Sequence, residues 1–337
     1  MILAIETSCD DTCAAVVTHA GEIRANVISS QGVHDRYGGV VPEVASRHHL
    51  ELATPVVDDA LQRAGATLDD VDLVAVTAGP GLVGALLVGV ATAKALAASR
   101  GLPLAAVDHL QGHVAADFLH TDGQGAGGAG GPFSPPFLCL IASGGHTFLA
   151  RVEDHDGFTV LGATLDDAAG EAIDKGARLL GLPFPGGPHL ERLAAEGDPE
   201  AFAFPTSQKL AGLDFSFAGL KTALLYKVRD LGEQEAQRRR ADLAAAYQHA
   251  IVEQLAQRVA RALDETGLDR LAIGGGVAAN GPLRARLGAL APTVHIPPRE
   301  LCTDNAAMIA SAARYGEHVP FPGYLGLEVH ATGQRAL

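Results

Sequence analysis

Two histidines one helical turn apart give the clearest chemical signal in this chain. His109 and His113 stand in the segment HLQGH, directly after a short apolar run. Residues four apart on a helix project from the same face, so the two imidazoles could bind one metal ion. Fourteen histidines make a chance pair of this spacing possible, so a third ligand is required. Asp304, at the start of the predicted last helix, is the candidate, and its alternative role is the cap of that helix.

Two histidines and one carboxylate form a ligand set that suits Fe(II) or Zn(II) and leaves positions open for substrate. The related metalloprotease motif is H-E-x-x-H, in which the glutamate activates a water molecule. Leu110 stands at the place of that glutamate. The segment therefore favours a divalent metal site and argues against a peptidase.

Three polar or glycine-rich turns could hold an anion through backbone N–H groups, because small side chains allow close approach. They are Ser8–Asp10, Ser143–Gly145, and the segment 273–283, in which Asn280 is a predicted helix N-cap. Nucleotide phosphates bind at such strand-to-helix turns in α/β proteins. Each turn alone is ambiguous, but the three together favour nucleotide binding. The segment G-x-x-x-x-G-K-[ST] does not occur in the sequence, which excludes a P-loop enzyme.

The segments that must position these residues alternate between strand and helix patterns. Apolar runs at 2–7 and 13–18 predict a hairpin, and a second hairpin of the same design is predicted at 137–143 and 148–153. Further strands are predicted at 71–77, 104–107, 271–276 and 294–297, and a glycine-rich turn that opens into a helix is predicted within 79–96. Other helices are predicted at 42–64, from 109, at 167–181 and 234–265, from 280 and from 304. This alternation predicts α/β layers with a largely parallel core, and the repeated hairpin predicts a duplicated fold with a nucleotide cleft between two lobes.

The expected domain division follows from the repeat. The first lobe covers 1–120 and is completed by a C-terminal helix at 304–325, and the second lobe covers 137–303. The Gly- and Pro-rich segment 121–136 between them is a predicted linker.

Bulk composition limits the function classes. A chain of 337 residues is long enough for two domains, and a net charge of −14 argues against a generally basic surface for nucleic acid. A local basic cluster runs from Lys221 to Arg240, which is either a solvated helix face or a contact for an anionic partner. The four cysteines form no C-x-x-C pair, so we expect reduced thiols.

No membrane association is expected. The apolar stretch 82–98 is interrupted by Gly84, Gly89 and Lys94, so it predicts a buried helix instead of a membrane span. No basic leader precedes the first strand, and the expected location is the cytoplasm.

Nine segments together resemble one known family. They occur in order between residues 6 and 310: ETSCDDT, PEVASRHH, GPGLVGALLVG, HLQGH, SGGHT, DDAAGEAIDKGARLLGLPFPGGP, FSFAGLKTA, GGGVAAN and CTDNAAMIA. This combination is similar to the tRNA N6-adenosine threonylcarbamoyltransferases, which have the actin-like/sugar-kinase ATPase fold and were once described as O-sialoglycoprotein endopeptidases. The chain departs from the family pattern at Asp11, where glutamate is usual, and at Ala278 and Ala306.

The resemblance implies a reaction, its ligands and its partners. The threonylcarbamoyl group of threonylcarbamoyl-AMP would pass to N6 of adenosine 37 in tRNAs that read ANN codons, with release of AMP. The partners implied are tRNA, an actin-like paralogue and a P-loop ATPase, and the ligands implied are one Fe²⁺ or Zn²⁺ ion and an adenine nucleotide. Position by position, His109, His113 and Asp304 match the metal ligands, Asp10 matches the acid of the first hairpin, and the substrate-binding positions are matched by Ile141, Ala142, Ser143, Gly144, Gly145, Asp174, Gly187 and Asn280.

Three other classes stay open from the sequence. A chaperone-like ATPase of the same fold would use the nucleotide cleft without needing the histidine pair. A sugar or acetate kinase would take ATP as donor and would also leave HLQGH without a role. A metalloprotease is disfavoured by Leu110.

Overall fold

The computed structural model describes residues 1–37, 39–120, 133–206, 210–331, and the described chain divides into two compact α/β units. Unit 1 comprises Met1–Pro135, Asp154–Gly157 and Asp304–Leu337, and unit 2 comprises Pro136–Glu153 and Phe158–Thr303. Most of the predicted linker 121–136 lies outside the described residues. The predicted α/β class with two lobes is confirmed.

Unit 1 is built on a five-stranded mixed sheet with the order β3-β2-β1-β4-β5. The first three strands form an antiparallel meander, and β4 and β5 run parallel to β1. The strand bounds are Ile2–Glu6 (β1), Asp11–Val17 (β2), Ile23–Ser30 (β3), Leu73–Gly79 (β4) and Leu104–Asp108 (β5). β1 and β4 are buried along their whole length, which explains why each appears in the sequence as a continuous apolar run.

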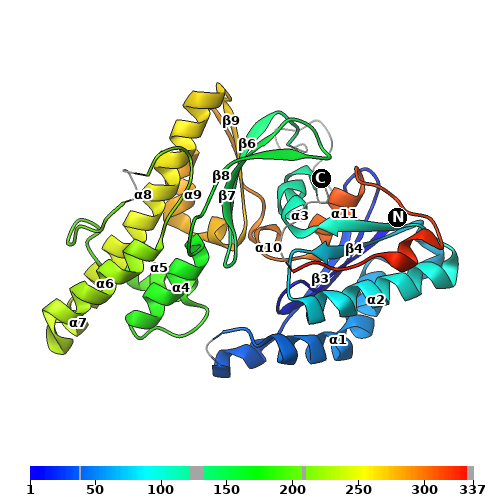
Figure 1. Cartoon of the computed structure of the whole chain (residues 1–337), viewed down its shortest axis with the longest axis horizontal. Coiled ribbons are helices and arrows are strands. Elements are labelled where there is room, and N and C mark those ends of the chain that lie inside the picture. Colours follow the sequence, from blue (N-terminus) through cyan, green and yellow to red (C-terminus); the bar gives the residue numbers. More distant parts are fainter. Residues whose placement is uncertain (38, 121–132, 207–209, 332–337) are drawn as a thin grey trace. The chain divides into compact units, whose positions relative to one another are not determined.

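Helices cover both faces of this sheet (Figure 1). On one face lie α1 (Pro42–Arg63) and α2 (Val83–Arg100), and on the other lie α3 (His109–Ala115) and α11 (Ala306–Ala313). Leu3 and Ile5 of β1 join a hydrophobic cluster with residues of α1 and α2. Because side chains alternate along a strand, the remaining residues of β1 face α3 and α11.

Unit 2 repeats the same topology around β6, with the order β10-β9-β6-β7-β8. Its antiparallel meander is β6 (Phe137–Ala142), β7 (Thr147–Val152) and β8 (Phe158–Ala163), and its parallel strands are β9 (Arg270–Gly274) and β10 (Thr293–His295). In both units a central strand therefore separates an antiparallel meander from two parallel strands. The predicted duplication is confirmed.

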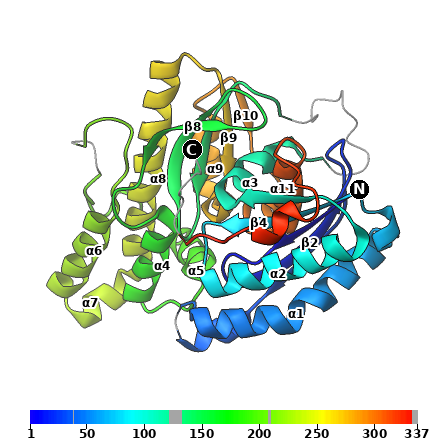
Figure 2. The same cartoon turned by 45° about the vertical axis from the view of Figure 1, so that its right-hand side comes forward.

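The helices of unit 2 carry its core. The long helix α8 (Arg240–Thr266), yellow in Figures 1 and 2, packs beside α9 (Gly281–Gly288), and its apolar residues share one cluster with β6 and β9. The other helices are α4 (Ala169–Leu179), α5 (Gly186–Ala194), α6 (Ala218–Leu231), α7 (Glu233–Arg238) and the short α10 (Arg299–Cys302).

Several predicted bounds are wrong. The helix expected over 234–265 is interrupted at Arg239, where α7 ends and α8 begins. The last helix was expected to cover 304–325, but α11 ends at Ala313 and a short 3-10 helix follows at Gly323–Gly326. Gly316, Pro320 and Pro322 lie between the two, and proline cannot continue a helix.

Among the described residues, α2 is the helix long and apolar enough to cross a membrane by length and composition. Its buried residues, such as Leu86, Val90 and Ala93, pack against β4 and α1. Only 33% of this helix is buried, so α2 packs against the sheet with one face, whereas the sequence predicts a buried helix. All four cysteines are free thiols, also as expected.

Close packing of α2 leads to a stability prediction. A Cβ added to Gly89 would collide with the Oγ1 atom of Thr7, whose buried hydroxyl donates a hydrogen bond to the carbonyl of Ala85 (2.9 Å). We expect Gly89→Ala to lower the free energy of unfolding by about 1–3 kcal/mol, because the collision forces the helix or the strand to shift. Urea unfolding measures the change. Gly219→Ala in α6 is the control, since its Cβ would meet no atom within 4 Å; an equal loss in both variants would contradict the packing argument.

Candidate metal centre and substrate turns

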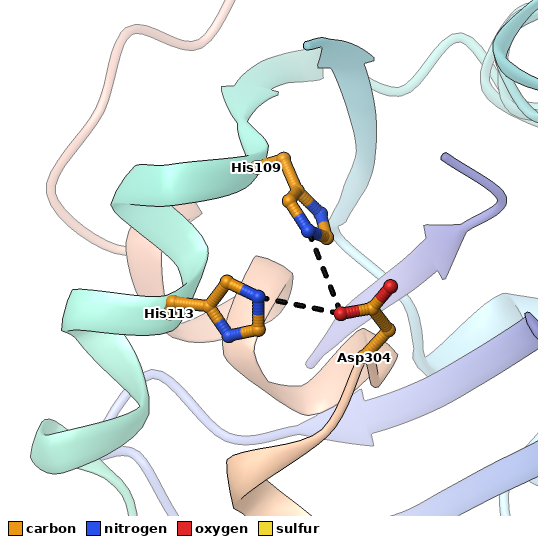
Figure 3. A group of neighbouring side chains, drawn as sticks. All are labelled: His109, His113 and Asp304. Atoms are coloured by element: carbon orange, nitrogen blue, oxygen red, sulfur yellow. Dashed lines mark ion pairs between the residues drawn. The ribbon is translucent and has the colours of Figure 1, made fainter. Parts of the chain in front are cut away.

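The two histidines of HLQGH and Asp304 converge in unit 1 (Figure 3). Helix α3 begins directly after Asp108, whose carboxylate caps it by accepting hydrogen bonds from the backbone N–H groups of Leu110 and Gln111. This start places His109 and His113 on one face of the helix. The Oδ1 atom of Asp304 lies 3.5 Å from Nε2 of His109 and 3.3 Å from Nε2 of His113.

Asp304 is not the cap of the last helix, so its alternative role is wrong. The N-cap of α11 is Asn305, whose Oδ1 accepts a hydrogen bond from the N–H of Met308 (3.0 Å). The neighbouring residue therefore satisfies the helix end, and the carboxylate of Asp304 is directed at the two imidazoles. Its side chain is 25% exposed, whereas those of His109 and His113 are 6% and 1% exposed.

The donor set suits a divalent metal ion, and its three ligand atoms lie within 4.8 Å of one another. Ligand atoms about 2.1 Å from a tetrahedral ion lie about 3.4 Å from one another, which matches the two N–O distances above. Both ring nitrogens of His113 are buried and have no hydrogen-bond partner within the part of the chain that the structure describes. A buried nitrogen without such a partner, 3.3 Å from a carboxylate oxygen, suits a metal ligand. The ligand roles of the three residues stay a prediction.

Charges dominate this centre despite its burial. Burial opposes ionisation of Asp304 and protonation of His109, but their mutual attraction reverses both effects. The pKa of Asp304 is therefore held well below its usual range, and Asp304 together with Glu6 raises the pKa of His109 well above its usual range. Burial would raise the pKa of Glu6, but the charge and hydrogen bond of His109 lower it. The carboxylates are therefore charged before a cation arrives.

The first polar turn lies next to this centre. The hydroxyl of Ser8 is 3.2 Å from Nδ1 of His109, and Asp10 follows two residues later, where its carbonyl accepts a hydrogen bond from the N–H of Gln31 (3.2 Å). Asp10 therefore shares the turn that contacts His109, and its catalytic role stays a prediction.

Asp11, the first residue of β2, gives a pH prediction. Burial, with the charges of Asp304 and Asp10, raises its pKa to about 6, against a hydrogen bond from Ser30 that lowers it. The folded state thus binds the proton more tightly than the unfolded chain, so the free energy of unfolding should fall as the pH rises from about 4 through 6. A pKa change from 3.8 to about 6 corresponds to about 3 kcal/mol at most.

The variant Asp11→Asn removes this ionisation. We expect it to stabilise the metal-free protein at pH 7.5 and to stabilise it much less at pH 4.5. Urea unfolding of both proteins at the two pH values measures the difference. A gain in stability that does not change with pH would show that the charge of Asp11 is not the cause.

The second turn, in unit 2, has the form expected of an anion site. It follows β6, which ends at Ala142, and it is closed by a hydrogen bond from the N–H of Ser143 to the carbonyl of His146 (2.7 Å). A Cβ at Gly144 or Gly145 would meet no atom within 4 Å, so the backbone of the turn is open to an approaching ligand. Ile141 and Ala142 are buried strand residues and position the turn instead of lining it.

Two neighbouring segments pack tightly against this turn. The carbonyl of Ser143 accepts a hydrogen bond from the N–H of Gly170 (3.1 Å) at the start of α4, and a Cβ at Gly170 would collide with it. Gly275 follows the parallel strand β9 with φ of 83°, and a Cβ there would collide with the carbonyl of Ala142. The N-terminus of α4 therefore lies beside the carboxyl ends of β6 and β9. Phosphates bind at this kind of place in α/β folds.

Asp174 and Gly187 are brought together by helix α5. Oδ1 of Asp174 accepts a hydrogen bond from the N–H of Gly186 (2.7 Å), and the N–H of Gly187 also bonds to this carboxylate. Burial raises the pKa of Asp174, and these N–H groups partly offset the effect. Asp174 therefore fixes the N-terminus of α5. A ligand hydroxyl that bonds to this carboxylate would share it with the N–H groups of Gly186 and Gly187.

Asn280 is the N-cap of α9, as predicted, and its amide is fully used within unit 2. Its Oδ1 accepts from the N–H of Leu283 (3.0 Å), and its Nδ2 donates to Glu191 (3.2 Å) and Gln248 (3.0 Å). Glu191 and Gln248 also line a pocket of about 410 Å³ between α5, α8 and α9. Neither residue is recognisable from the sequence, because the contacts join segments far apart in the chain.

The remaining charged clusters have structural partners. Asp166 accepts hydrogen bonds from the hydroxyl of Ser216 and from the first N–H groups of α6, and Lys175 pairs with Asp167 (2.8 Å) and Glu171 (2.7 Å). In the basic cluster, Arg238 and Arg239 pair with acidic residues of α7 and α8, at 2.6 Å and 3.2 Å. These ion pairs reduce the positive charge that the sequence alone indicates.

Comparison with known proteins identifies relatives over nearly the whole chain. The model of the family "TsaD: tRNA N6-adenosine threonylcarbamoyltransferase" matches residues 22–311. The tRNA N6-adenosine threonylcarbamoyltransferase of Moorella thermoacetica is 52% identical over 93% of this chain and 91% of its own length. The protein of the same name from Symbiobacterium thermophilum is 50% identical over 94% of this chain and 91% of its own.

Solved structures with low identity share the fold. Component A of the (R)-2-hydroxyglutaryl-CoA dehydratase of Acidaminococcus fermentans aligns with a TM-score of 0.54 at 14% identity. The alignment covers 94% of this chain and 96% of that protein's chain. Full-length HypF, in a phosphate- and nucleotide-bound form, has a TM-score of 0.56 at 13% identity over 93% of this chain and 46% of its own. At these identities the likeness concerns the fold alone.

Proposed function

Since the chain belongs to the tRNA N6-adenosine threonylcarbamoyltransferase family, we propose that it transfers the threonylcarbamoyl group from threonylcarbamoyl-AMP to N6 of adenosine 37 in tRNAs reading ANN codons. Membership of the family already makes the protein an acyltransferase that modifies tRNA. The proposal concerns the identity of the donor and of the target base. The observation that carries it is the family match over residues 22–311, which includes the three predicted metal ligands and the predicted turn residues of unit 2.

In this proposal His109, His113 and Asp304 hold one Fe²⁺ or Zn²⁺ ion. When bound, such an ion supplies a Lewis acid that orients and polarises the threonylcarbamoyl group. The contribution of the chain is to present two imidazole nitrogens and one carboxylate oxygen from a rigid frame. The two histidines stand on α3, whose start is capped, and Asp304 directly precedes Asn305, the cap of α11.

The adenylate is assigned to unit 2. The open backbone at Gly144 and Gly145, beside the N-terminus of α4, is the proposed site of its phosphate. Asp174 is the proposed acceptor for a ribose hydroxyl, with Gly187 beside it. Asn280 contributes by fixing the start of α9, because its amide is already hydrogen-bonded.

The transfer needs no covalent enzyme intermediate, because the acyl group arrives activated. The exocyclic amine of the adenosine forms a bond to the carbamoyl carbon, the bond from that carbon to the phosphate oxygen breaks, and AMP leaves with the electron pair. The amine loses a proton, and Asp10 is the proposed acceptor. The chain's main contribution is to hold donor and acceptor in position.

Partners complete the proposal. With a net charge of −14 the protein needs either a local basic surface for tRNA, such as Lys221–Arg240, or one supplied by an actin-like paralogue and a P-loop ATPase. Since the substrate is tRNA, we place the reaction in the cytoplasm.

An in vitro transfer assay tests the proposal. The protein and its proposed partners are mixed with unmodified tRNA and threonylcarbamoyl-AMP, with Fe²⁺ or Zn²⁺ or with a chelator, and the nucleosides are identified by mass spectrometry. We expect threonylcarbamoyladenosine only when metal is present. Absence of this product from a folded, metal-loaded complex would reject the transfer and favour a kinase-type or chaperone-like ATPase.

A further inference from the structure

Glu6 is a buried carboxylate beside the candidate metal centre, and it is not one of the three proposed ligands. It ends β1, and its side chain is completely buried. One oxygen, Oε1, accepts a hydrogen bond from the N–H of Ser8. The other, Oε2, lies 2.5 Å from the hydroxyl of Thr77 and 3.0 Å from Nδ1 of His109.

The strand geometry explains why Glu6 reaches His109. Leu3 and Ile5 point into the cluster with α1 and α2, so Glu6 points to the face of the sheet that carries α3. Thr77 stands on β4, which runs parallel to β1, and β5 leads directly into His109. A carboxylate in this position costs several kcal/mol unless its oxygens are hydrogen-bonded, and here both are.

The contact determines which nitrogen of His109 faces the centre. A carboxylate accepts hydrogen bonds, so Nδ1 of His109 carries the proton that it donates to Glu6. Nε2, the atom that faces Asp304, is then the nitrogen that gives up its proton to bind a metal ion. A hydrogen bond at one ring nitrogen fixes the proton and the orientation of a ligand histidine in just this way.

We propose that Glu6 is a positioning residue, which holds the ring of His109 with its proton on Nδ1 so that Nε2 is presented to the metal ion. The inference rests on the metal role proposed above. His109 and His113 differ in this respect, because no hydrogen-bond partner for the ring nitrogens of His113 occurs among the described residues. The centre therefore has one imidazole whose Nδ1 contacts a carboxylate and, among the described residues, one whose Nδ1 has no such contact.

Glutamine cannot replace this carboxylate. Glu6 accepts hydrogen bonds at both oxygens. In Glu6→Gln the amide NH₂ faces either the N–H of Ser8, which is also a donor, or Nδ1 of His109, which would then have to accept. In the second case the proton of His109 moves to Nε2 and blocks the metal. The variant keeps the volume, removes the negative charge and changes this hydrogen-bond pattern.

Two measurements on the full chain test the role, and neither needs transfer activity. The first is the Zn²⁺ affinity by competition with a chelator, compared between the wild type, Glu6→Gln and Thr77→Val. The second is the NMR signal of the His109 Nδ1–H in the Zn²⁺-loaded wild type. Thr77→Val is the matched control, because it removes one donor to Glu6 and leaves the contact with His109 intact.

We expect Glu6→Gln to weaken Zn²⁺ binding by about 10–100-fold and Thr77→Val to change it by less than about threefold. In the Zn²⁺-loaded wild type, we expect the Nδ1–H signal of His109 to be shifted downfield and slow to exchange. A purely structural role would lower the thermal stability of Glu6→Gln but leave the affinity of the folded protein unchanged, and that result overturns the inference. If Glu6→Gln does not fold, a fast-exchanging Nδ1–H in the wild type has the same consequence. A wild type that binds no Zn²⁺ rejects the metal site itself.

Discussion

Asp304→Asn is expected to lower the rate of threonylcarbamoyl transfer by about a thousandfold or more, with the protein still folded. Asn has the same shape as Asp, but it removes the charge of a carboxylate that faces both imidazoles, at 3.5 Å and 3.3 Å. Loss of several kcal/mol of metal binding and Lewis-acid stabilisation corresponds to a factor of this size. The helix cap survives, because Asn305 provides it.

The measurement is the initial rate of threonylcarbamoyladenosine formation at saturating metal, together with the metal content of the purified protein. Asp72→Asn is the matched control. Asp72 is also a carboxylate of unit 1, but it is 59% exposed and pairs with the N-terminus and with His19. We expect the control to retain the wild-type rate. An Asp304→Asn protein that keeps both its metal and its rate would remove Asp304 from the ligand set.

The sequence predicts the elements whose physical cause is local. β1 and β4 are buried on both faces and therefore appear as unbroken apolar runs, and the N-cap at Asn280 is recognisable from its own residue type. The third strand of each meander was missed for the opposite reason. β3 and β8 are only partly buried, so their apolar pattern is weak.

Other elements depend on contacts between distant parts of the chain. Helix α6 begins where Asp166, 51 residues before Phe217, accepts the first N–H groups. No local pattern around 217 indicates this cap. Helix α5 begins within a Gly-Pro segment because Asp174 binds its N-terminus. The acidic residues can be read from the sequence, but the helix ends that they bind cannot.

The candidate site divides in the same way. The spacing of His109 and His113 places both on one helix face, but it does not specify which acid meets them. Asp304 was selected by its position at a helix start, and the structure shows that this position is made available by Asn305 as the actual cap. Glu6 did carry a signal, since it is a charged residue at the end of an otherwise apolar strand. Its partner His109 could not be inferred without the sheet.

Gly145→Val should weaken AMP binding by about a hundredfold or more without lowering the stability of the fold. The backbone at Gly145 does not require glycine, because its φ is not positive and an added Cβ would meet no atom within 4 Å. A valine side chain would instead occupy the open space that we assign to the phosphate. Loss of two hydrogen bonds to a charged group, at about 1.5–3 kcal/mol each, corresponds to a factor of at least this size.

Isothermal calorimetry with AMP and urea unfolding distinguish this effect from a folding defect. Gly288→Val at the end of α9 is the control, because it places the same side chain in open space away from the β6–β7 turn. We expect wild-type AMP affinity for Gly288→Val and wild-type stability for Gly145→Val. Measuring both AMP binding and stability matters, because glycine turns usually have only a structural role. If the β6–β7 turn had only that role, Gly145→Val would bind AMP as tightly as the wild type. Unchanged AMP binding in Gly145→Val would therefore assign this turn to the fold and move the phosphate site elsewhere, whereas selective loss of binding would identify the turn as the anion site of unit 2.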